Sequence, residues 1–139
     1  SYLWESNAIL NFLADGSEFL QTEPRLRTQV LQWQFFEQYS HEPYIAVARR
    51  IQWLEGMPAA RAEEYKICQV RGHKALRVME RQLQQTPYLV GDRYTIADIA
   101  LYAYTHVAHE GGFDLSGYPA VNAWLARVAS HPQHVTMLG

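Results

Sequence analysis

Glu5 and Ser6 are the residues whose types and spacing point most directly to ligand chemistry. The apolar residues Ile9, Phe12 and Leu13 predict a short helix that starts at Ser6. The amide groups of a helix's first turn are unpaired, and together with the helix dipole they favour an anion. Three residues after Ser6 the chain has Ile9 rather than a carboxylate, so an external carboxylate could occupy these donors.

A helix start beside an acidic residue is a receptor for an amino-acid zwitterion, which carries a carboxylate and an ammonium group. The alternative is that Ser6 only caps its own helix and that Glu5 is solvated. The two residues by themselves favour this structural alternative.

Segment 94–99 carries the best-defined helix start in the chain. Thr95 is predicted to be the N-cap, and Asp98 completes a capping box in place of the usual Glu or Gln. Tyr94 and Ile99 flank the box as a hydrophobic staple. Asp98 could also be drawn as a general base, but the capping box accounts for it, so we predict a structural role.

Two groups of residues have a spacing that metal sites use. His106, His109 and Glu110 form one group, and His131 with His134 form the other, since residues three apart share a helix face. Neither group has an evident further ligand. We therefore predict no metal site.

The helix predicted to begin at Pro24 is apolar on two faces. One face carries Leu26, Val30 and Trp33, and the other carries Leu31, Phe35 and Tyr39. A helix of this kind must contact two partners. Pro43 removes a backbone donor, so we expect a kink or break around residues 40–43 and a second segment over residues 44–54.

The later periodicity is also helical. Steps of three and four predict a long helix over residues 59–85, with Cys68 on its buried face. A further helix should start near Pro119 and end before Pro132. Between them lies the small-residue helix that follows the capping box, with Ala100 and Ala103 on its packed side. Small residues let neighbours approach closely, so this helix is expected at the centre of a bundle.

The composition fits one globular domain and excludes several classes of protein. The chain has 139 residues, of which 48% are hydrophobic, enough for a core without disulfides or metal. Its single cysteine fits a reducing compartment, so we expect a cytoplasmic protein. A net charge of -2 without a long basic run argues against a nucleic-acid partner. No uncharged stretch is long enough to span a membrane.

Three segments together resemble the cytosolic glutathione transferase superfamily. Residues 3–10, Leu-Trp-Glu-Ser-Asn-Ala-Ile-Leu, look like the junction between the last strand of the family's thioredoxin-like domain and the following helix. Residues 89–99 are similar to the capping-box segment of its C-terminal helical domain, and residues 118–132 to its closing helix.

The resemblance implies an all-α fold, a bundle of about five to six helices over residues 6–139. Residues 1–5 would be the remnant of the thioredoxin-like domain, with residues 1–4 as a strand end that has no partner in this chain.

The resemblance also implies a function for the intact parent. Such enzymes conjugate the thiolate of glutathione to small hydrophobic electrophiles, with glutathione as co-substrate and no other cofactor. The resemblance assigns Ser6 to the free carboxylate of the γ-glutamyl group and Glu5 to its ammonium. This favours a ligand-binding role for the two residues, whereas the residues by themselves favour a structural one. The Ser, Cys or Tyr that activates the thiol belongs to the thioredoxin-like domain. We therefore expect no catalytic residue in this chain and no activity of the fragment by itself.

In the family, the helical domain supplies the wall of the second-substrate pocket, and members are usually dimers. The candidate wall residues are aromatic or polar residues near the proposed kink and on the central helix: Tyr39, Pro43, Tyr44, Tyr102 and His106. Each is explained at least as well by packing. The two-faced helix over residues 24–39 is the expected homodimer face.

A second function of a different class fits the same fold. Translation-factor subunits and regulatory proteins use this helical domain as a non-catalytic interaction module. The retained Glu5-Ser6 pair favours a glutathione binder over such a module.

Overall fold

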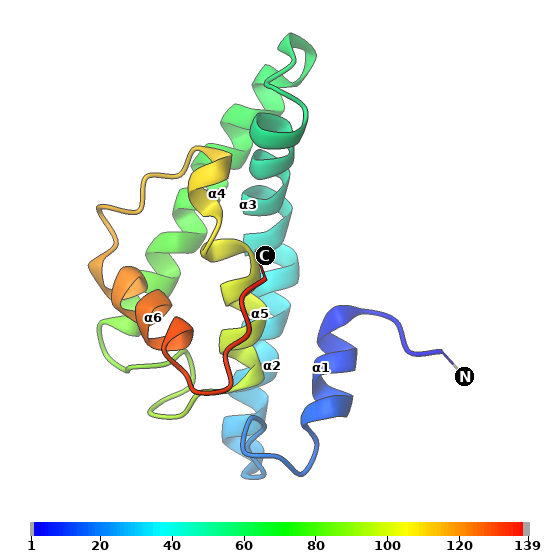
Figure 1. The fold of residues 1–139 in the computed structure, drawn as a ribbon, viewed down its shortest axis with the longest axis vertical. Coiled ribbons are helices and arrows are strands. Elements are labelled where there is room, and N and C mark those ends of the chain that lie inside the picture. The colour runs from blue at the N-terminus through cyan, green and yellow to red at the C-terminus, as the bar shows by residue number, and fades with distance from the viewer. Residues whose placement is uncertain (1, 138–139) are drawn as a thin grey trace.

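The computed structural model describes residues 2–137, which form a bundle of α-helices (Figure 1). The helices are α1 (Ser6–Ala14), α2 (Pro24–Phe36), α3 (Glu42–Arg49), α4 (Ala62–Leu83), α5 (Ile96–Thr105) and α6 (Pro119–Ala129). Residues 2–137 contain no strand, so the predicted all-α fold is confirmed. Within the same residues, no helix is both long and apolar enough to cross a lipid bilayer.

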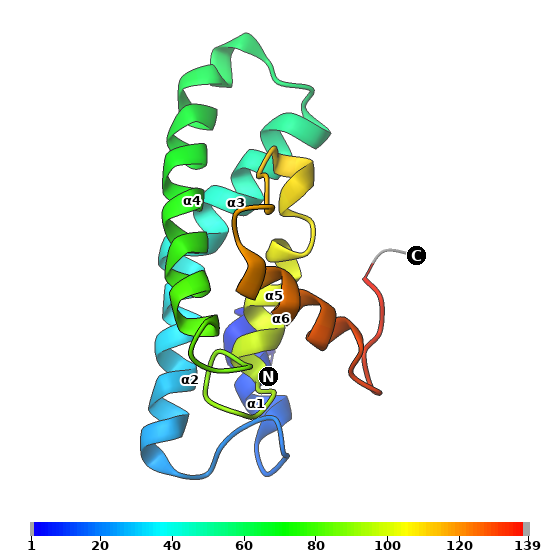
Figure 2. The ribbon, with the colours of Figure 1, turned by 90° about the vertical axis from the view of Figure 1, so that its left-hand side faces the viewer.

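Two long helical segments form the frame of the bundle. Figure 2 shows α3 alongside α4 and α2 continuing past the end of α4, and α3 packs closely on α4. A 3-10 turn, Ala59–Arg61, leads into α4, and this helix ends just before the loop that contains Thr86 and Pro87. The predicted helix over residues 59–85 is thus found with slightly shorter bounds. Cys68 is buried as expected, and burial raises the pKa of its thiol.

Of the kink or break predicted around residues 40–43, the break is wrong. The chain continues from α2 through a π-helical turn, Glu37–His41, directly into α3, in which Pro43 occupies the first turn. In this turn the amide of Glu42 bonds to the carbonyl of Glu37, five residues back. Proline has no backbone N–H, so it cannot complete the regular α-helical hydrogen bonds. A π-helical turn, whose hydrogen bonds join residues five apart, precedes Pro43, and the helix continues through it.

The two apolar faces of α2 have different environments. Val30 is fully buried, and Leu26 and Trp33 pack partly against the core. On the other face, Phe35 is 71% exposed and Tyr39, in the π-helical turn, is 84% exposed. One face therefore meets the bundle, and within residues 2–137 nothing covers these two aromatic side chains.

The predicted capping box is confirmed at the start of α5. Thr95 is the N-cap, its hydroxyl accepts from the amide of Ala97 at 3.2 Å, and the Asp98 carboxylate accepts from the amide of Thr95 at 2.9 Å. The amide of Ile96 bonds to the carbonyl of Phe19 at 3.0 Å, which ties the start of α5 to the α1–α2 connection. Thr95 and Ala97 are fully buried. The helix is central, as expected, since it contacts α1, α2, α3 and α6.

The first residues of the described chain differ from the prediction. Tyr2, Leu3 and Trp4 lie in no strand and are exposed, because residues 2–137 offer them no partner strand. Residue 1, which was part of the predicted strand end, lies outside the described residues. Figure 1 shows α1 standing beside the bundle with this segment pointing away from it.

Candidate functional site

A polar network attaches α1 to α2 and fixes the position of Ser6. Asn7 donates from its side-chain amide to the Glu37 carboxylate at 3.0 Å, and the Gln34 amide donates to Asn7 Oδ1 at 3.3 Å. Asn11 donates to Gln34 Oε1 at 2.7 Å. Gln34 and Glu37 are both buried. Because buried polar groups must find partners, this network sets one register of α1 against α2.

The start of α1 leaves its first-turn donors without a side-chain cap. Ser6 is the first helical residue, and Glu5, at the N-cap position, makes no capping hydrogen bond. The alternative in which Ser6 caps its own helix therefore lacks its hydrogen bond. Glu5 has a φ of 68°, a left-handed conformation that costs a side-chain-bearing residue on the order of 1 kcal/mol or more. Both Glu5 and Ser6 are exposed.

A cleft of about 790 Å³ lies between α1, α5 and the C-terminal segment that follows α6. Its walls are mainly aromatic and aliphatic, and Ser6, Asn7 and Glu37 supply polar groups at one part of the lining. The remaining side chains come from α1, α5, the residue before the N-cap of α5 and the C-terminal segment: Ile9, Leu10, Tyr94, Ile99, Ala100, Tyr102, Ala103, Tyr104, Gln133, His134, Val135 and Met137. An apolar cleft with a few polar groups is the usual form of a small-molecule site.

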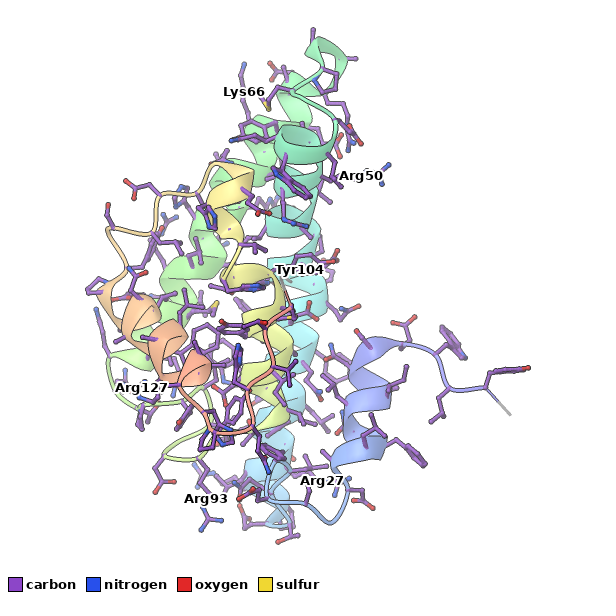
Figure 3. All side chains as sticks on the ribbon, in the orientation of Figure 1. Arg27, Arg50, Lys66, Arg93, Tyr104 and Arg127 are labelled. Atoms are coloured by element: carbon purple, nitrogen blue, oxygen red, sulfur yellow. The ribbon has the colours of Figure 1, made fainter. Side chains whose placement is uncertain are left out.

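The C-terminal segment is held against the bundle by ring contacts. The His131 ring lies 4.8 Å from the ring of Tyr94 and 5.9 Å from that of Phe19, between centroids. The His134 ring meets Tyr102 edge-on at 5.3 Å. Figure 1 shows this segment overlapping α5 in projection, Figure 2 shows it standing off from that helix, and Figure 3 labels Tyr104 near it. The segment thus forms one wall of the cleft.

The five residues predicted for the second-substrate wall do not meet at one place. Tyr102 lines the large cleft, and the His106 ring stacks on it at 4.7 Å without lining the cleft itself. Tyr39 and Tyr44 instead border a cavity of about 100 Å³ between the π-helical turn and α4. Pro43 lines neither space and is half-buried.

The other predicted site residues have structural surroundings. Tyr94 lines the cleft and packs edge-on against Phe19 at 5.7 Å, while Ile99 lines the same cleft. Glu110 of the suggested metal group pairs with Arg49 instead. In the described residues, no three His, Cys, Asp or Glu side chains are arranged to hold a metal ion.

Glu37 is a cleft residue that was not predicted from the sequence. It is 5% exposed, although it carries a carboxylate. The sequence contains a pattern that could have identified Glu37. It lies four residues after Trp33, so it continues the helix face that carries Leu26 and Val30. A carboxylate in a position where the period calls for an apolar side chain indicates either a polar network or a ligand contact.

The sequence matches a known family over most of its length. Residues 33–132 match the family described as "Glutathione S-transferase, C-terminal domain". The chain belongs to the glutathione S-transferase family. The match covers the helices α3 to α6, the end of α2 and the capping box, so the predicted superfamily is confirmed.

Similar proteins carry more than one named activity. A glutathione S-transferase from Pseudomonas fluorescens [Pf-5] has a crystal structure with a TM-score of 0.97 and 75% identity, over 99% of this chain and 68% of that one. The disulfide-bond oxidoreductase YfcG of Escherichia coli (strain K12) is 34% identical over 94% of this chain and 60% of its own length. Elongation factor 1-gamma of Danio rerio is 30% identical over 99% of this chain and 31% of its own length. The chain thus spans less than two thirds of these two curated relatives.

Proposed function

We propose that the chain is the C-terminal domain of a cytoplasmic glutathione transferase, whose full-length form conjugates glutathione to small apolar electrophiles. The observation that carries this proposal is the cleft between α1, α5 and the C-terminal segment, since Ser6 and the apolar wall border the same space. A hydrophilic thiol compound and an apolar electrophile can therefore be held side by side.

At one end of the cleft, the start of α1 offers a place for the γ-glutamyl carboxylate. Its first-turn amides lack a side-chain cap, and the helix dipole adds a positive potential there. Glu5 supplies a negative charge next to it for the ammonium group. Its left-handed backbone supports this role, because strain of this kind is often retained at ligand sites.

The remaining wall suits the electrophile. Tyr102 and Ile99 present aromatic and aliphatic surface from α5, and Val135 and Met137 do so from the C-terminal segment. Burial of an apolar group against such surface contributes roughly 25 cal/mol for each Å² removed from water. We assign no catalytic residue to this chain and expect the fragment alone to be inactive. Glutathione is the co-substrate, and we propose no other cofactor.

The test fills the apolar part of the cleft in the full-length protein. Ala103 lines the cleft, whereas Ala123 lies exposed on α6 and serves as a matched control. Ala103→Trp should weaken binding of S-hexylglutathione about tenfold while leaving glutathione affinity within about twofold, since only the hexyl chain uses the apolar wall. Ala123→Trp should change neither. An equal loss of affinity for both ligands in Ala103→Trp would contradict the assignment of the apolar cleft wall to the electrophile.

A non-catalytic interaction module is the second candidate, and the similarity to elongation factor 1-gamma favours it. A module would need neither glutathione nor the cleft. Assays of the full-length protein for conjugation of 1-chloro-2,4-dinitrobenzene and for binding of S-hexylglutathione separate the two. Absence of both activities in a folded sample would favour the module.

We also propose that the protein is a homodimer that uses the exposed face of α2. Leu31, Phe35 and Tyr39 follow one another at steps of four and are 38%, 71% and 84% exposed. Phe35→Glu should shift the full-length protein from dimer to monomer in light scattering. Gln32→Glu, at an exposed polar position on the same helix, should leave the mass unchanged. A wild-type monomer at high concentration would contradict this assignment.

A further inference from the structure

Glu37 holds a buried negative charge that the described residues leave unneutralised. Its side chain is 5% exposed and lines the cleft. Within residues 2–137, no Lys, Arg or His nitrogen comes within 4.0 Å of its carboxylate. Buried charges in proteins are nearly always paired or bound to a ligand, because removing them from water is costly.

The hydrogen bonds of Glu37 occupy only part of its carboxylate. The side-chain amides of Asn7 and Gln38 donate to Oε2 at 3.0 and 2.7 Å. No described residue donates to Oε1. Neither amide brings a positive charge. The side chain is held in place by two neutral donors, and one oxygen stays available to a molecule in the cleft.

The surroundings add to the negative potential. Glu42 lies one turn further along the same helix, and its pKa is raised first by burial and then by the charge of Glu37. Tyr102 and Tyr104 contribute aromatic rings to the cleft. A carboxylate together with aromatic faces is the chemistry that recognises an ammonium group, since both attract a cation.

We propose that the Glu37 carboxylate binds an ammonium group of the molecule that occupies the cleft, and so selects ligands with an amine and an apolar body. The ammonium has two possible sources. One is the α-ammonium of glutathione, which Glu37 would hold together with Glu5, because Asn7, which bonds to Glu37, is next to Ser6. The other is an amine on the second ligand. The first source rests on the proposed function, and the second does not.

The experiment compares amines with neutral analogues by calorimetry on the full-length protein. The first pair is 4-phenylbutylamine and 4-phenylbutan-1-ol, and the second is glutathione and its analogue without the amino group, glutaryl-cysteinylglycine. The variant Glu37→Gln removes the charge and keeps an oxygen for Asn7 and Gln38. Glu18→Gln is the matched control, since Glu18 is exposed and does not line the cleft.

The wild type should bind the amine at least tenfold more tightly than its neutral analogue in one of the two pairs. Glu37→Gln should abolish that preference, while Glu18→Gln keeps it. Loss of preference in the phenylbutyl pair identifies the second ligand as the source, and loss in the glutathione pair identifies glutathione.

An unchanged preference in Glu37→Gln, or no amine preference in either wild-type pair, overturns the proposal. The melting temperature of Glu37→Gln should stay within a few degrees of wild type, which separates loss of the charge from loss of the fold. If the wild type bound no glutathione, the proposed function would be contradicted. The phenylbutyl pair would still test whether Glu37 binds an ammonium group.

Discussion

Trp124 donates a hydrogen bond of 2.9 Å from its indole Nε1 to Oδ1 of Asp98. The same oxygen accepts from the amide of Leu89 at 3.0 Å, and Oδ2 accepts from the amide of Thr95 at 2.9 Å. Asp98 thus joins α5, α6 and the loop after α4 at one fully buried point. Its role extends beyond the capping box predicted from the sequence.

Asp98→Ala should therefore cost more than the loss of a helix cap. A cap alone contributes about 1 kcal/mol, but this change also leaves the buried donors of Leu89 and Trp124 unpaired. We expect the free energy of unfolding to fall by about 3 kcal/mol or more in urea titrations. Asp114→Ala, which removes an exposed carboxylate bonded to the Ser116 amide, should leave the midpoint nearly unchanged. Similar losses for the two variants would argue against the three-way junction.

The capping box could be read from the sequence because it is local, with both partners within four residues. The buried face of α2 was also predictable, since periodicity alone identifies it. The contacts of Asp98 with Trp124 and Leu89 could not be read, because they join residues 26 and 9 positions apart. Local patterns predict helices well, whereas the packing of helices decides which side chains meet.

The same limit explains the division of the candidate pocket residues. Tyr39, Tyr44 and Tyr102 look alike in sequence, but the hairpin of α2, α3 and α4 places the first two on a different side from the third. The break that Pro43 suggested is absent because a π-helical turn carries the chain from α2 into α3. No residue pattern within that turn signals its wider spacing.

His41 should make the stability depend on pH. Its ring is fully buried, and Nε2 lies 2.8 Å from the hydroxyl of Thr105, which itself donates to the Leu101 carbonyl. Nε2 is therefore the protonated nitrogen, and Nδ1 has no hydrogen-bond partner among the described residues. Burial lowers the pKa of His41 from 6.5 to about 3.

The unfolded chain binds a proton at His41 below pH 6.5, while the folded protein does so only near pH 3. The contribution of this residue to stability is thus present above pH 6.5 and is lost as the pH falls toward 3. From pH 7.5 to pH 5 the loss should be about 2 kcal/mol in wild type. His41→Gln should lack this component in chemical denaturation, and His109→Gln, an exposed control, should retain it. Parallel pH profiles for wild type and His41→Gln would contradict the assignment.

Gly72 should be intolerant of any side chain. An added Cβ would meet the Phe113 ring, which is buried against α4, and would lie 3.3 Å from Cγ1 of Ile45. Gly72→Ala should lower the free energy of unfolding by about 1–3 kcal/mol through overpacking. Phe113→Leu in the Gly72→Ala background should recover part of the loss. Gly117→Ala, whose Cβ would meet nothing within 4 Å, provides the control. Equal stability of Gly72→Ala and wild type would show that the ring moves aside freely.

The account depends above all on the start of α1 as a site for the glutathione carboxylate. Calorimetric titration of the full-length protein with glutathione tests it most directly, with Ser6→Ala as the variant. Ser130→Ala is the control, since its hydroxyl only bonds to the Arg127 carbonyl at the end of α6. A hydrogen bond to a charged group contributes about 1.5–3 kcal/mol, so Ser6→Ala should weaken binding at least tenfold while Ser130→Ala binds as wild type does. Equal affinity of Ser6→Ala and wild type, or no binding by the wild type, would contradict the account.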